Sequence, residues 1–183
     1  YSSGVPMRNA VGPMDYTPGV INTFQPEYYL STHYNGGGIG TRAYQMALFV
    51  LFETGLQMLV DNPTMYYREE DCARFMASIP LPTDETVSLA AKVGEYAIVA
   101  KRKGDKWYIG GMTNNKEKER VFELPLNFLP EGSTWKMVSY EDGVNANKQA
   151  MHYVKREQEV KKGQTIRVKM ARNGGFAAVL SFK

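Results

Sequence analysis

The sequence has few of the residues that metal, redox and membrane proteins depend on. It contains a single cysteine, Cys72, and two histidines, His33 and His152. An intrachain disulfide, a CxxC motif and a histidine-rich metal site are therefore excluded. No run of about 18 apolar residues is present, so we expect no membrane-spanning helix. The length of 183 residues is also too short for a complete (β/α)8 barrel, which takes about 250 residues.

The overall composition, with 43% hydrophobic and 22% charged residues, is that of a globular protein. The charge is unevenly distributed. Residues 1–83 hold four basic and seven acidic side chains, and residues 84–183 hold 18 basic and 12 acidic ones. Pro80 and Pro82 separate the two parts, so we predict two domains, 1–83 and 84–183. Because the chain begins with Tyr1 and shows no signal peptide, we expect a piece of a longer protein.

The second part has the pattern of short antiparallel strands. In the run 165–170, Ile166, Val168 and Met170 alternate with two basic residues, as in a strand that buries one face. Gly104 lies in a charged hairpin turn, where a positive φ is needed. Further strands are predicted at 95–100, 107–113, 120–124, 134–140, 152–156 and 176–182. This pattern predicts a small antiparallel β-sandwich.

The first part has a different pattern. Residues 41–54 are apolar nearly all round, which predicts a helix buried on several sides. Residues 56–60 are predicted to form a short buried strand, and Asn62 is predicted to cap a second amphipathic helix that ends before Pro80. Helix, strand and helix are a piece of α/β architecture. A single βα unit cannot bury its own sheet faces, so this half looks incomplete by itself.

Two segments carry candidate ligand-binding side chains. Asp61 follows the predicted strand, at the end where substrates bind in parallel α/β folds; alternatively, it is a helix-capping carboxylate. Asp15, Tyr16 and Thr17 place a carboxylate, a phenol and a hydroxyl on a proline-stiffened loop, which suits sugar binding and also suits a plain structural turn. Both interpretations remain open for each segment.

Arg42 is predicted to lie at a helix N-terminus, where the macrodipole disfavours a positive charge. We therefore expect it to pair with a carboxylate or to contact a ligand. Glu53, within an apolar segment, is expected to be paired. The glycine run at 35–40 lacks the following Gly-Lys-Ser/Thr of a phosphate-binding loop. We expect no nucleic-acid binding, because that needs basic and aromatic residues interleaved on one sheet face, whereas the basic runs 101–103 and 161–162 lie at predicted turns, where solvated charge is ordinary.

Several motifs give the chain a specific resemblance. They are 8–19, with Gly-Pro-Met-Asp-Tyr-Thr-Pro-Gly, then 40–42, 45–54 and 56–61, and in the second part 79–80, 84–85, 94–96, 102–104, 107–111, 142–145 and 174–176. In this order they closely resemble the C-terminal third of family 97 glycoside hydrolases, which include α-glucosidases and α-galactosidases. The resemblance covers nearly the whole chain.

The resemblance implies the terminal segment of a (β/α)8 barrel over 1–83 and a C-terminal antiparallel β-sandwich over 84–183. Glycoside hydrolysis needs two carboxyl groups, and those of the family, with its calcium-binding glutamates, lie upstream of the motifs found here. No catalytic residue and no calcium ligand is therefore expected in this chain. Its expected substrate contacts are Asp15, Tyr16, Thr17, Arg42 and Asp61.

The expected partners are an oligosaccharide or α-glycoside substrate and the upstream barrel of the same parent protein, and the expected location is periplasmic or secreted. Two alternatives remain. In one, residues 84–183 form a carbohydrate-binding module that stacks sugars on Tyr96, Trp107, Tyr108 or Trp135. In the other, they form a purely structural domain that buries these aromatic residues.

Overall fold

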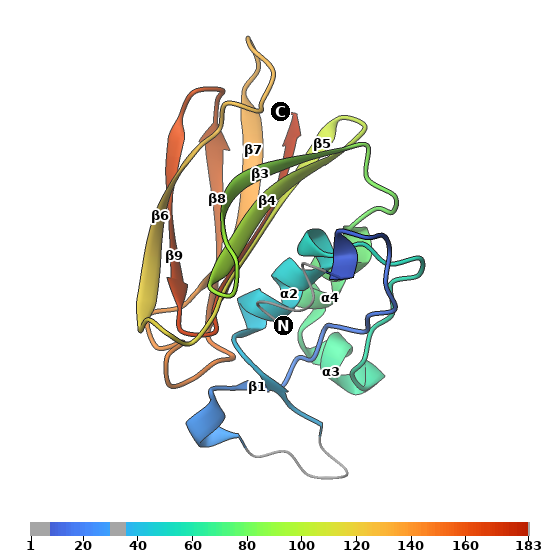
Figure 1. Cartoon of the computed structure of the whole chain (residues 1–183), viewed down its shortest axis with the longest axis vertical. Helices are drawn as coiled ribbons and strands as arrows, with labels where there is room; N and C mark the ends of the chain where they lie inside the picture. The colour runs from blue at the N-terminus through green and yellow to red at the C-terminus, as the bar shows by residue number, and fades with distance from the viewer. Residues whose placement is uncertain (1–7, 30–35, 183) are drawn as a thin grey trace.

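The computed structural model describes residues 8–29 and 36–182, so Tyr1, His33 and Asn35 lie outside the described residues. The described chain is a layer of helices packed on antiparallel β-structure (Figure 1). The elements are, in order, β1 (Thr23–Phe24), the 3-10 helix η1 (Pro26–Tyr28), β2 (Gly38–Ile39), α2 (Arg42–Leu51), α3 (Pro63–Arg68), α4 (Glu70–Ser78), β3 (Glu85–Lys92), β4 (Tyr96–Lys103), β5 (Lys106–Thr113), β6 (Glu119–Pro125), β7 (Trp135–Asp142), β8 (Tyr153–Val160), β9 (Thr165–Ala171) and β10 (Gly175–Phe182).

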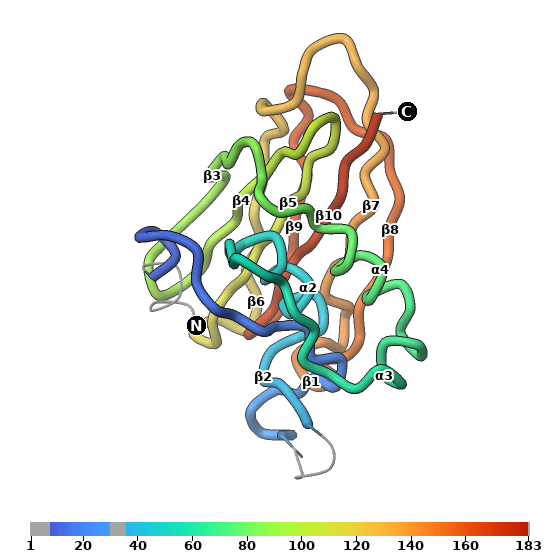
Figure 2. The backbone as a smooth tube through the Cα atoms, turned by 90° about the vertical axis from the view of Figure 1, so that its right-hand side faces the viewer, coloured from blue at the N-terminus to red at the C-terminus, as the bar shows by residue number. Residues whose placement is uncertain are grey.

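The β-structure confirms the antiparallel domain that the strand pattern predicted. Six strands form one sheet in the order β3-β4-β5-β10-β7-β8, and β6 pairs with β9 in a second, two-stranded sheet. Every pairing in these two sheets is antiparallel. Figure 2 shows the six strands side by side, with α2 and α4 in front of them.

The middle strands of the six-stranded sheet are buried on both faces, because their side chains alternate between two hydrophobic cores. On β10, Phe176, Ala178 and Leu180 point into the core shared with β6 and β9. Ala177, between them, belongs to the core shared with α2 and α4. Successive side chains of a strand point to opposite faces of its sheet, so one sheet can pack against a layer on each side.

The helical layer lies very close to the sheet, because glycines replace side chains where α2 crosses it. A Cβ at Gly110 of β5 would lie 2.7 Å from Cβ of Val50 and 2.9 Å from the carbonyl oxygen of Ala47. The ten residues of α2 are all buried. The N-terminal part and the β-strands therefore share one hydrophobic core, whatever the location of the domain boundary.

The structure corrects one predicted element of the first part. Residues 56–60 do not form a buried strand: Leu56 is 69% exposed, and Met58, Leu59 and Val60 are each more than 40% exposed. A strand needs a neighbouring strand for its backbone N–H and C=O groups, and the described residues supply only one backbone–backbone bond here, from the Val60 amide to the Pro18 carbonyl. The described part of 8–83 has no parallel pairing beyond the two-residue strands β1 and β2.

The helices differ from the prediction in their ends. The predicted helix over 41–54 begins after Thr41, whose hydroxyl caps the Tyr44 amide, and ends at Leu51. Asn62 caps the next helix by accepting from the Thr64 amide, as predicted. That helix is interrupted at Glu69, where the backbone leaves the helical region, so α3 and α4 are separate. Strand β3 was not predicted as an individual element. Among the described residues no helix is both long and apolar enough to span a bilayer.

Candidate functional site

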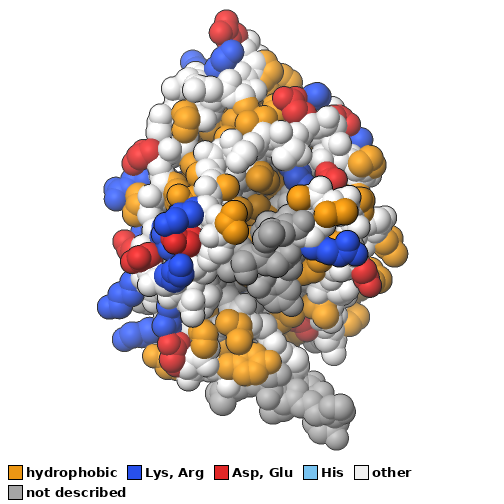
Figure 3. Space-filling model, in the orientation of Figure 1, with side chains coloured by type: hydrophobic (Ala, Val, Ile, Leu, Met, Phe, Trp, Pro, Cys, Tyr) orange, Lys and Arg blue, Asp and Glu red, His pale blue; other side chains and the backbone are white. Residues whose placement is uncertain are grey.

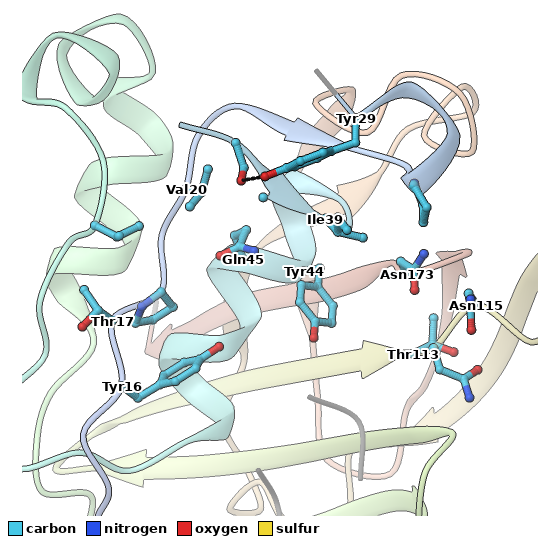
Figure 4. Close-up of a pocket in the computed structure, with 16 residues that line it drawn as sticks. Tyr16, Thr17, Val20, Tyr29, Ile39, Tyr44, Gln45, Thr113, Asn115 and Asn173 are labelled. Carbon is cyan, nitrogen blue, oxygen red and sulfur yellow. Dashed lines mark hydrogen bonds between the residues drawn. The ribbon is translucent and has the colours of Figure 1, made fainter. Parts of the chain in front are cut away.

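A pocket of about 600 Å³ lies at the junction of the N-terminal loop (residues 9–19), α2 and the β-strands. Its walls come from segments far apart in the sequence. In Figure 4, Tyr16 and Thr17 lie on one side, Thr113, Asn115 and Asn173 on the other, and Tyr44 of α2 between them. A volume of this size is in the usual range for small-molecule sites, about 300–1,000 Å³.

The loop that carries Tyr16 and Thr17 is fixed on the two sides by long-range hydrogen bonds. Its beginning is held by Asn9, whose carboxamide donates to the Glu53 carbonyl (2.9 Å) and accepts from the Glu53 amide (2.8 Å). Its end is held at Gly19, whose amide donates to Gln45 Oε1 (3.1 Å) and whose carbonyl accepts from the Tyr66 hydroxyl (2.8 Å). The first wall of the pocket is therefore a positioned loop.

The opposite wall is fixed by a group of hydrogen bonds around the Gln25 side chain. The Gln25 carboxamide donates to the carbonyls of Ala146 (3.1 Å) and Arg172 (2.7 Å) and accepts from Asn173 (3.3 Å). The Arg172 guanidinium forms a bidentate ion pair with Glu27, at 2.6 and 2.7 Å. These bonds join the N-terminal segment to the β7–β8 loop and to the turn before β10.

The structure brings only two of the five predicted contact residues into this pocket. Tyr16 and Thr17 line it, whereas Asp15, although exposed, is not among the lining residues. The Tyr16 ring is held edge-on against Phe52, with ring centroids 5.3 Å apart. The side chain of Thr17 is exposed.

Arg42 lies elsewhere, in a mainly structural environment. Its side chain is 7% exposed and pairs with Glu69 (Nη1 to Oε2, 3.0 Å). Its Nε donates to the Ile21 carbonyl (3.2 Å), and its guanidinium lies 5.6 Å from the centre of the Tyr153 ring. The Glu69 carboxylate offsets the positive charge of Arg42 at the start of α2. This agrees with one of the two interpretations of Arg42, namely that it pairs with a carboxylate.

Both carboxylate oxygens of Asp61 accept hydrogen bonds from backbone amides. Its Oδ2 accepts from the Ile21 amide (2.8 Å) and its Oδ1 from the Asn62 amide (2.7 Å). The Asp61 amide donates to the Tyr66 hydroxyl (2.9 Å), and burial raises the pKa of that phenol. In this arrangement Asp61 joins the start of α3 to the segment before β1.

Several lining residues were not singled out from the sequence, namely Tyr29, Tyr44, Gln45, Asn114, Asn115 and Asn173. A signal existed for Gln45, which is a polar residue within an otherwise apolar helix. None existed for the asparagines, because Asn114, Asn115 and Asn173 lie in turns, where asparagine is ordinary.

The aromatic residues considered as a sugar-stacking platform are mostly buried. Trp107 is 2% exposed, Trp135 1% and Tyr108 5%. Tyr96 packs on Phe122, with ring centroids 4.9 Å apart. The three buried rings fill the cores on the two faces of the sheet and offer no face to a saccharide.

The residues that line the pocket can bind but are not equipped for acid–base chemistry. None of the lining residues that the structure describes is Asp, Glu, Lys, Arg or His. Among the described residues, no cluster of three or more His, Cys, Asp or Glu side chains could hold a metal ion. The pocket therefore offers neutral hydrogen-bonding groups and aromatic rings.

Comparison with known proteins identifies the architecture. Residues 82–181 match the family model described as glycosyl-hydrolase 97 C-terminal, oligomerisation. The chain belongs to this family. The glycosyl-hydrolase 97 match begins three residues before β3 and includes the whole six-stranded sheet except Phe182, the last residue of β10.

Relatives extend the likeness to residues outside the family model. The chain is 37% identical over 171 residues to the retaining alpha-galactosidase of Bacteroides thetaiotaomicron, covering 93% of this chain and 25% of the relative. It is 31% identical over 172 residues to a probable retaining alpha-galactosidase of Streptomyces bingchenggensis, covering 94% of this chain and 24% of the relative. The chain thus spans about a quarter of the length of these relatives.

Solved structures agree on the fold. A glycoside hydrolase family 97 enzyme from Pseudoalteromonas sp. strain K8, in complex with panose, matches with a TM-score of 0.81 and 27% identity over 96% of this chain and 27% of the other. A beta-arabinopyranosidase matches with a TM-score of 0.75 and 22% identity, over 94% of this chain and 26% of the other.

Proposed function

We propose that this glycosyl-hydrolase 97 chain is the C-terminal portion of an exo-acting, retaining α-glycosidase that hydrolyses α-galactosides. The catalytic carboxyl pair, one acid and one nucleophile about 5–5.5 Å apart in retaining enzymes, then belongs to upstream residues of the parent protein. Two relatives described as retaining alpha-galactosidases support the galactoside. An α-glucoside is the alternative substrate.

The observation that carries the proposal is the uncovered apolar segment at 56–60. Leu56, Met58, Leu59 and Val60 form one run of exposed hydrophobic side chains with almost no backbone pairing. Hydrophobic side chains reach the surface in several places on the face of Figure 3. Contiguous exposed apolar surface marks a contact site. In our proposal this segment is a strand of a (β/α)8 barrel whose other strands come from upstream residues, as the sequence pattern of 56–60 predicts.

The residues of this chain then have a supporting role in the reaction. The pocket loop supplies the hydroxyls of Tyr16 and Thr17 for substrate positioning, and Arg42 and Asp61 hold the loop and the helix starts through their backbone bonds. Calcium, which the family resemblance implies, would be held by upstream residues, because the described residues include no suitable group of ligands. The periplasmic or secreted location stays a prediction.

Hydrolysis assays test the assignment. The 183-residue chain is expected to release no nitrophenol from 4-nitrophenyl α-galactoside or α-glucoside, since it lacks the carboxyl pair, whereas the parent protein is expected to hydrolyse one of them with retention. Turnover by the isolated chain that is lost in Asp15→Asn or Asp61→Asn would contradict the proposal, as would a parent protein inactive on both glycosides.

Met58→Gln tests the barrel strand. Met58 is 42% exposed in this chain, so the substitution is expected to change its free energy of unfolding by at most about 0.5 kcal/mol. In the parent protein, where the proposal buries Met58, the loss is expected to be about 2 kcal/mol or more. Denaturant unfolding of both proteins measures the two changes. Equal, small changes in both would argue against a buried strand at 56–60.

A second proposed function is association between copies, which the family description names as oligomerisation. Strands β3 and β8 end the six-stranded sheet. Strand β8 is rich in exposed charged residues, which discourage edge-to-edge pairing. Strand β3 exposes a charged residue only at each end, Glu85 and Lys92, and the exposed residues between them, Thr86, Ser88 and Ala91, are small and uncharged. We therefore propose that β3 is the edge that contacts a second copy.

Analytical ultracentrifugation tests this contact. Ser88→Lys, on β3, is expected to shift the chain from dimer to monomer, and the matched substitution Gln158→Lys, on β8, is expected to leave the dimer intact. A wild-type chain that stays monomeric at all concentrations would rule out a dimer formed by this part of the protein. Equal effects of the two substitutions would rule out β3 as the edge.

A further inference from the structure

The pocket between the N-terminal loop and the β-strands has a composition that selects its ligand. Among the described residues that line it none is charged, so a phosphate, a carboxylate or an amine would find no opposite charge on them. Nine of the lining residues carry a hydroxyl or a carboxamide: Tyr16, Thr17, Tyr29, Tyr44, Gln45, Thr113, Asn114, Asn115 and Asn173. Such groups donate and accept hydrogen bonds. A neutral ligand with many hydroxyl groups is their chemical complement.

Some of these polar side chains already form hydrogen bonds within the walls of the pocket. Asn114 donates to the Gly94 carbonyl (2.6 Å) and accepts from the Lys116 amide (3.1 Å). The Tyr29 hydroxyl donates to the Gly37 carbonyl (3.2 Å), drawn as the dashed line in Figure 4. These bonds fix the shape of the pocket before a ligand arrives, which lowers the entropic cost of binding.

Two other lining side chains are exposed and uncommitted. Within the described part of the chain, the hydroxyl of Thr17 and the carboxamide of Asn115 make no hydrogen bond, and both residues are exposed. They lie on opposite sides of the pocket in Figure 4, Thr17 on the N-terminal loop and Asn115 after β5. A ligand that bridges them would contact both halves of the chain.

Aromatic rings complete the surface. Tyr16 packs edge-on against Phe52, and Tyr29 packs edge-on against Phe24, with ring centroids 6.0 Å apart. A tyrosine ring presents an apolar face together with a polar hydroxyl. A pyranose has the same mixed character, with C–H groups on its faces and hydroxyls around its edge.

We propose that this pocket binds one neutral saccharide unit, with the N-terminal loop supplying Tyr16 and Thr17 and the β-domain supplying Asn115. The inference deepens the proposed glycosidase function, because it makes the β-domain a direct contributor to saccharide binding. The other conceivable occupant is a segment of upstream chain. The exposed Thr17 hydroxyl and Asn115 carboxamide, which make no hydrogen bond within the described part of the chain, favour the saccharide.

Titration of the 183-residue chain with neutral and charged saccharides, followed by heteronuclear NMR, tests the proposal. Methyl α-galactoside and maltose are the neutral probes, and galacturonate and galactose 1-phosphate are the charged ones. We expect neutral probes to bind with a Kd in the millimolar range and to shift the amide signals around Tyr16, Asn115 and Asn173. The charged probes are expected to bind more weakly, because the pocket offers them no counter-charge. The absence of shifts with every neutral probe would overturn the proposal.

Matched asparagine substitutions locate the site. Asn115→Ala is expected to weaken saccharide binding about five- to tenfold, the loss typical of one neutral hydrogen bond. Asn127→Ala, at an exposed asparagine that does not line this pocket, is expected to leave the affinity unchanged. Thr17→Val tests the opposite wall and is expected to act like Asn115→Ala. Equal melting temperatures of the variants establish that the fold is intact.

Two outcomes separate this inference from its rivals. Saccharide binding that is insensitive to Asn115→Ala and Thr17→Val would overturn it. Binding to the 183-residue chain that disappears in the longer parent protein would also overturn it, in favour of an upstream segment as the occupant. Hydrolysis by the parent can persist in either case, so failure of this inference is distinguishable from failure of the proposed glycosidase function.

Discussion

Gly175 of β10 lies directly against the backbone of Tyr44 on α2. A Cβ atom placed on Gly175 would come within 2.3 Å of the Tyr44 Cα and 2.5 Å of its amide nitrogen. Neither backbone can move alone, because Gly175 donates to the Asp142 carboxylate and α2 is buried along its whole length. The contact therefore sets the distance between the helical layer and the sheet, at the edge of the saccharide pocket.

Gly175→Ala is expected to destabilise the chain by about 2–4 kcal/mol, because the methyl group must displace backbone rather than a flexible side chain. The control is Gly55→Ala, at a glycine whose Cβ would meet nothing within 4 Å, and it is expected to stay within about 0.5 kcal/mol of wild type. Denaturant-induced unfolding measures both. Similar losses in the two variants would mean that the close approach of α2 is not the cause.

Asp142 predicts a pH dependence of stability. Burial raises its pKa to about 7, while the Thr41 side chain and the amides of Ala171 and Gly175 oppose the shift. Its Oδ1 has no hydrogen-bond partner among the described residues. In the unfolded chain an aspartate has a pKa of about 3.9, so the folded state binds the proton more tightly. Stability is therefore expected to fall as the pH rises from about 4 to about 7, at about 1.4 kcal/mol per unit of pKa difference.

Asp142→Asn isolates this effect. The asparagine keeps an oxygen that can accept from the Ala171 and Gly175 amides but carries no titrating carboxyl group. The stability difference between variant and wild type is therefore expected to grow in favour of the variant between pH 5 and pH 8. Chemical unfolding across this range measures it. A constant difference would show that the Asp142 carboxyl does not titrate with a raised pKa.

Substitutions at Lys101 and at Glu53 are expected to have unequal effects on the stability of the chain. Lys101 is 5% exposed, and its desolvation lowers its pKa, although Glu53, at 3.5 Å, acts in the opposite direction. Glu53→Gln leaves the buried cation without its partner and is expected to cost about 1–3 kcal/mol. Lys101→Met removes the cation itself, and Glu53 keeps its bond from the Thr83 hydroxyl (2.8 Å), so the change is expected to stay within about 1 kcal/mol. Thermal unfolding compares them, and a larger loss for Lys101→Met would contradict the argument.

Cys72 is expected to be unreactive in the folded chain. It is completely buried in the core between α2 and α4, and burial raises the pKa of its thiol to about 11, although the contacts with Tyr153 and Arg42 oppose this. A disulfide reagent at pH 8 is therefore expected to modify it only after unfolding in urea. Because Cys72 is the chain's one cysteine, the absorbance of the chromophore that the reagent releases reports on this thiol alone. Rapid modification without denaturant would show that the helical layer opens readily.

The sequence by itself determined the antiparallel strands of 84–183, because an alternation such as Ile166, Val168 and Met170 leaves only one way to bury a strand. It also determined the cap at Asn62, which needs only local bonding, and the family, through motifs distributed along nearly the whole chain. The tertiary structure decided the features that depend on contacts between residues far apart in the sequence. An apolar run at 56–60 becomes a strand only beside another strand, and none of the described strands lies next to it. Likewise, the bonds that Arg42 and Asp61 make depend on Glu69 and on the Ile21 amide, which are far from them in the sequence and reach them only in space. The pocket unites Thr17 with Asn115 only because α2 packs on a sheet in which glycine leaves room for it.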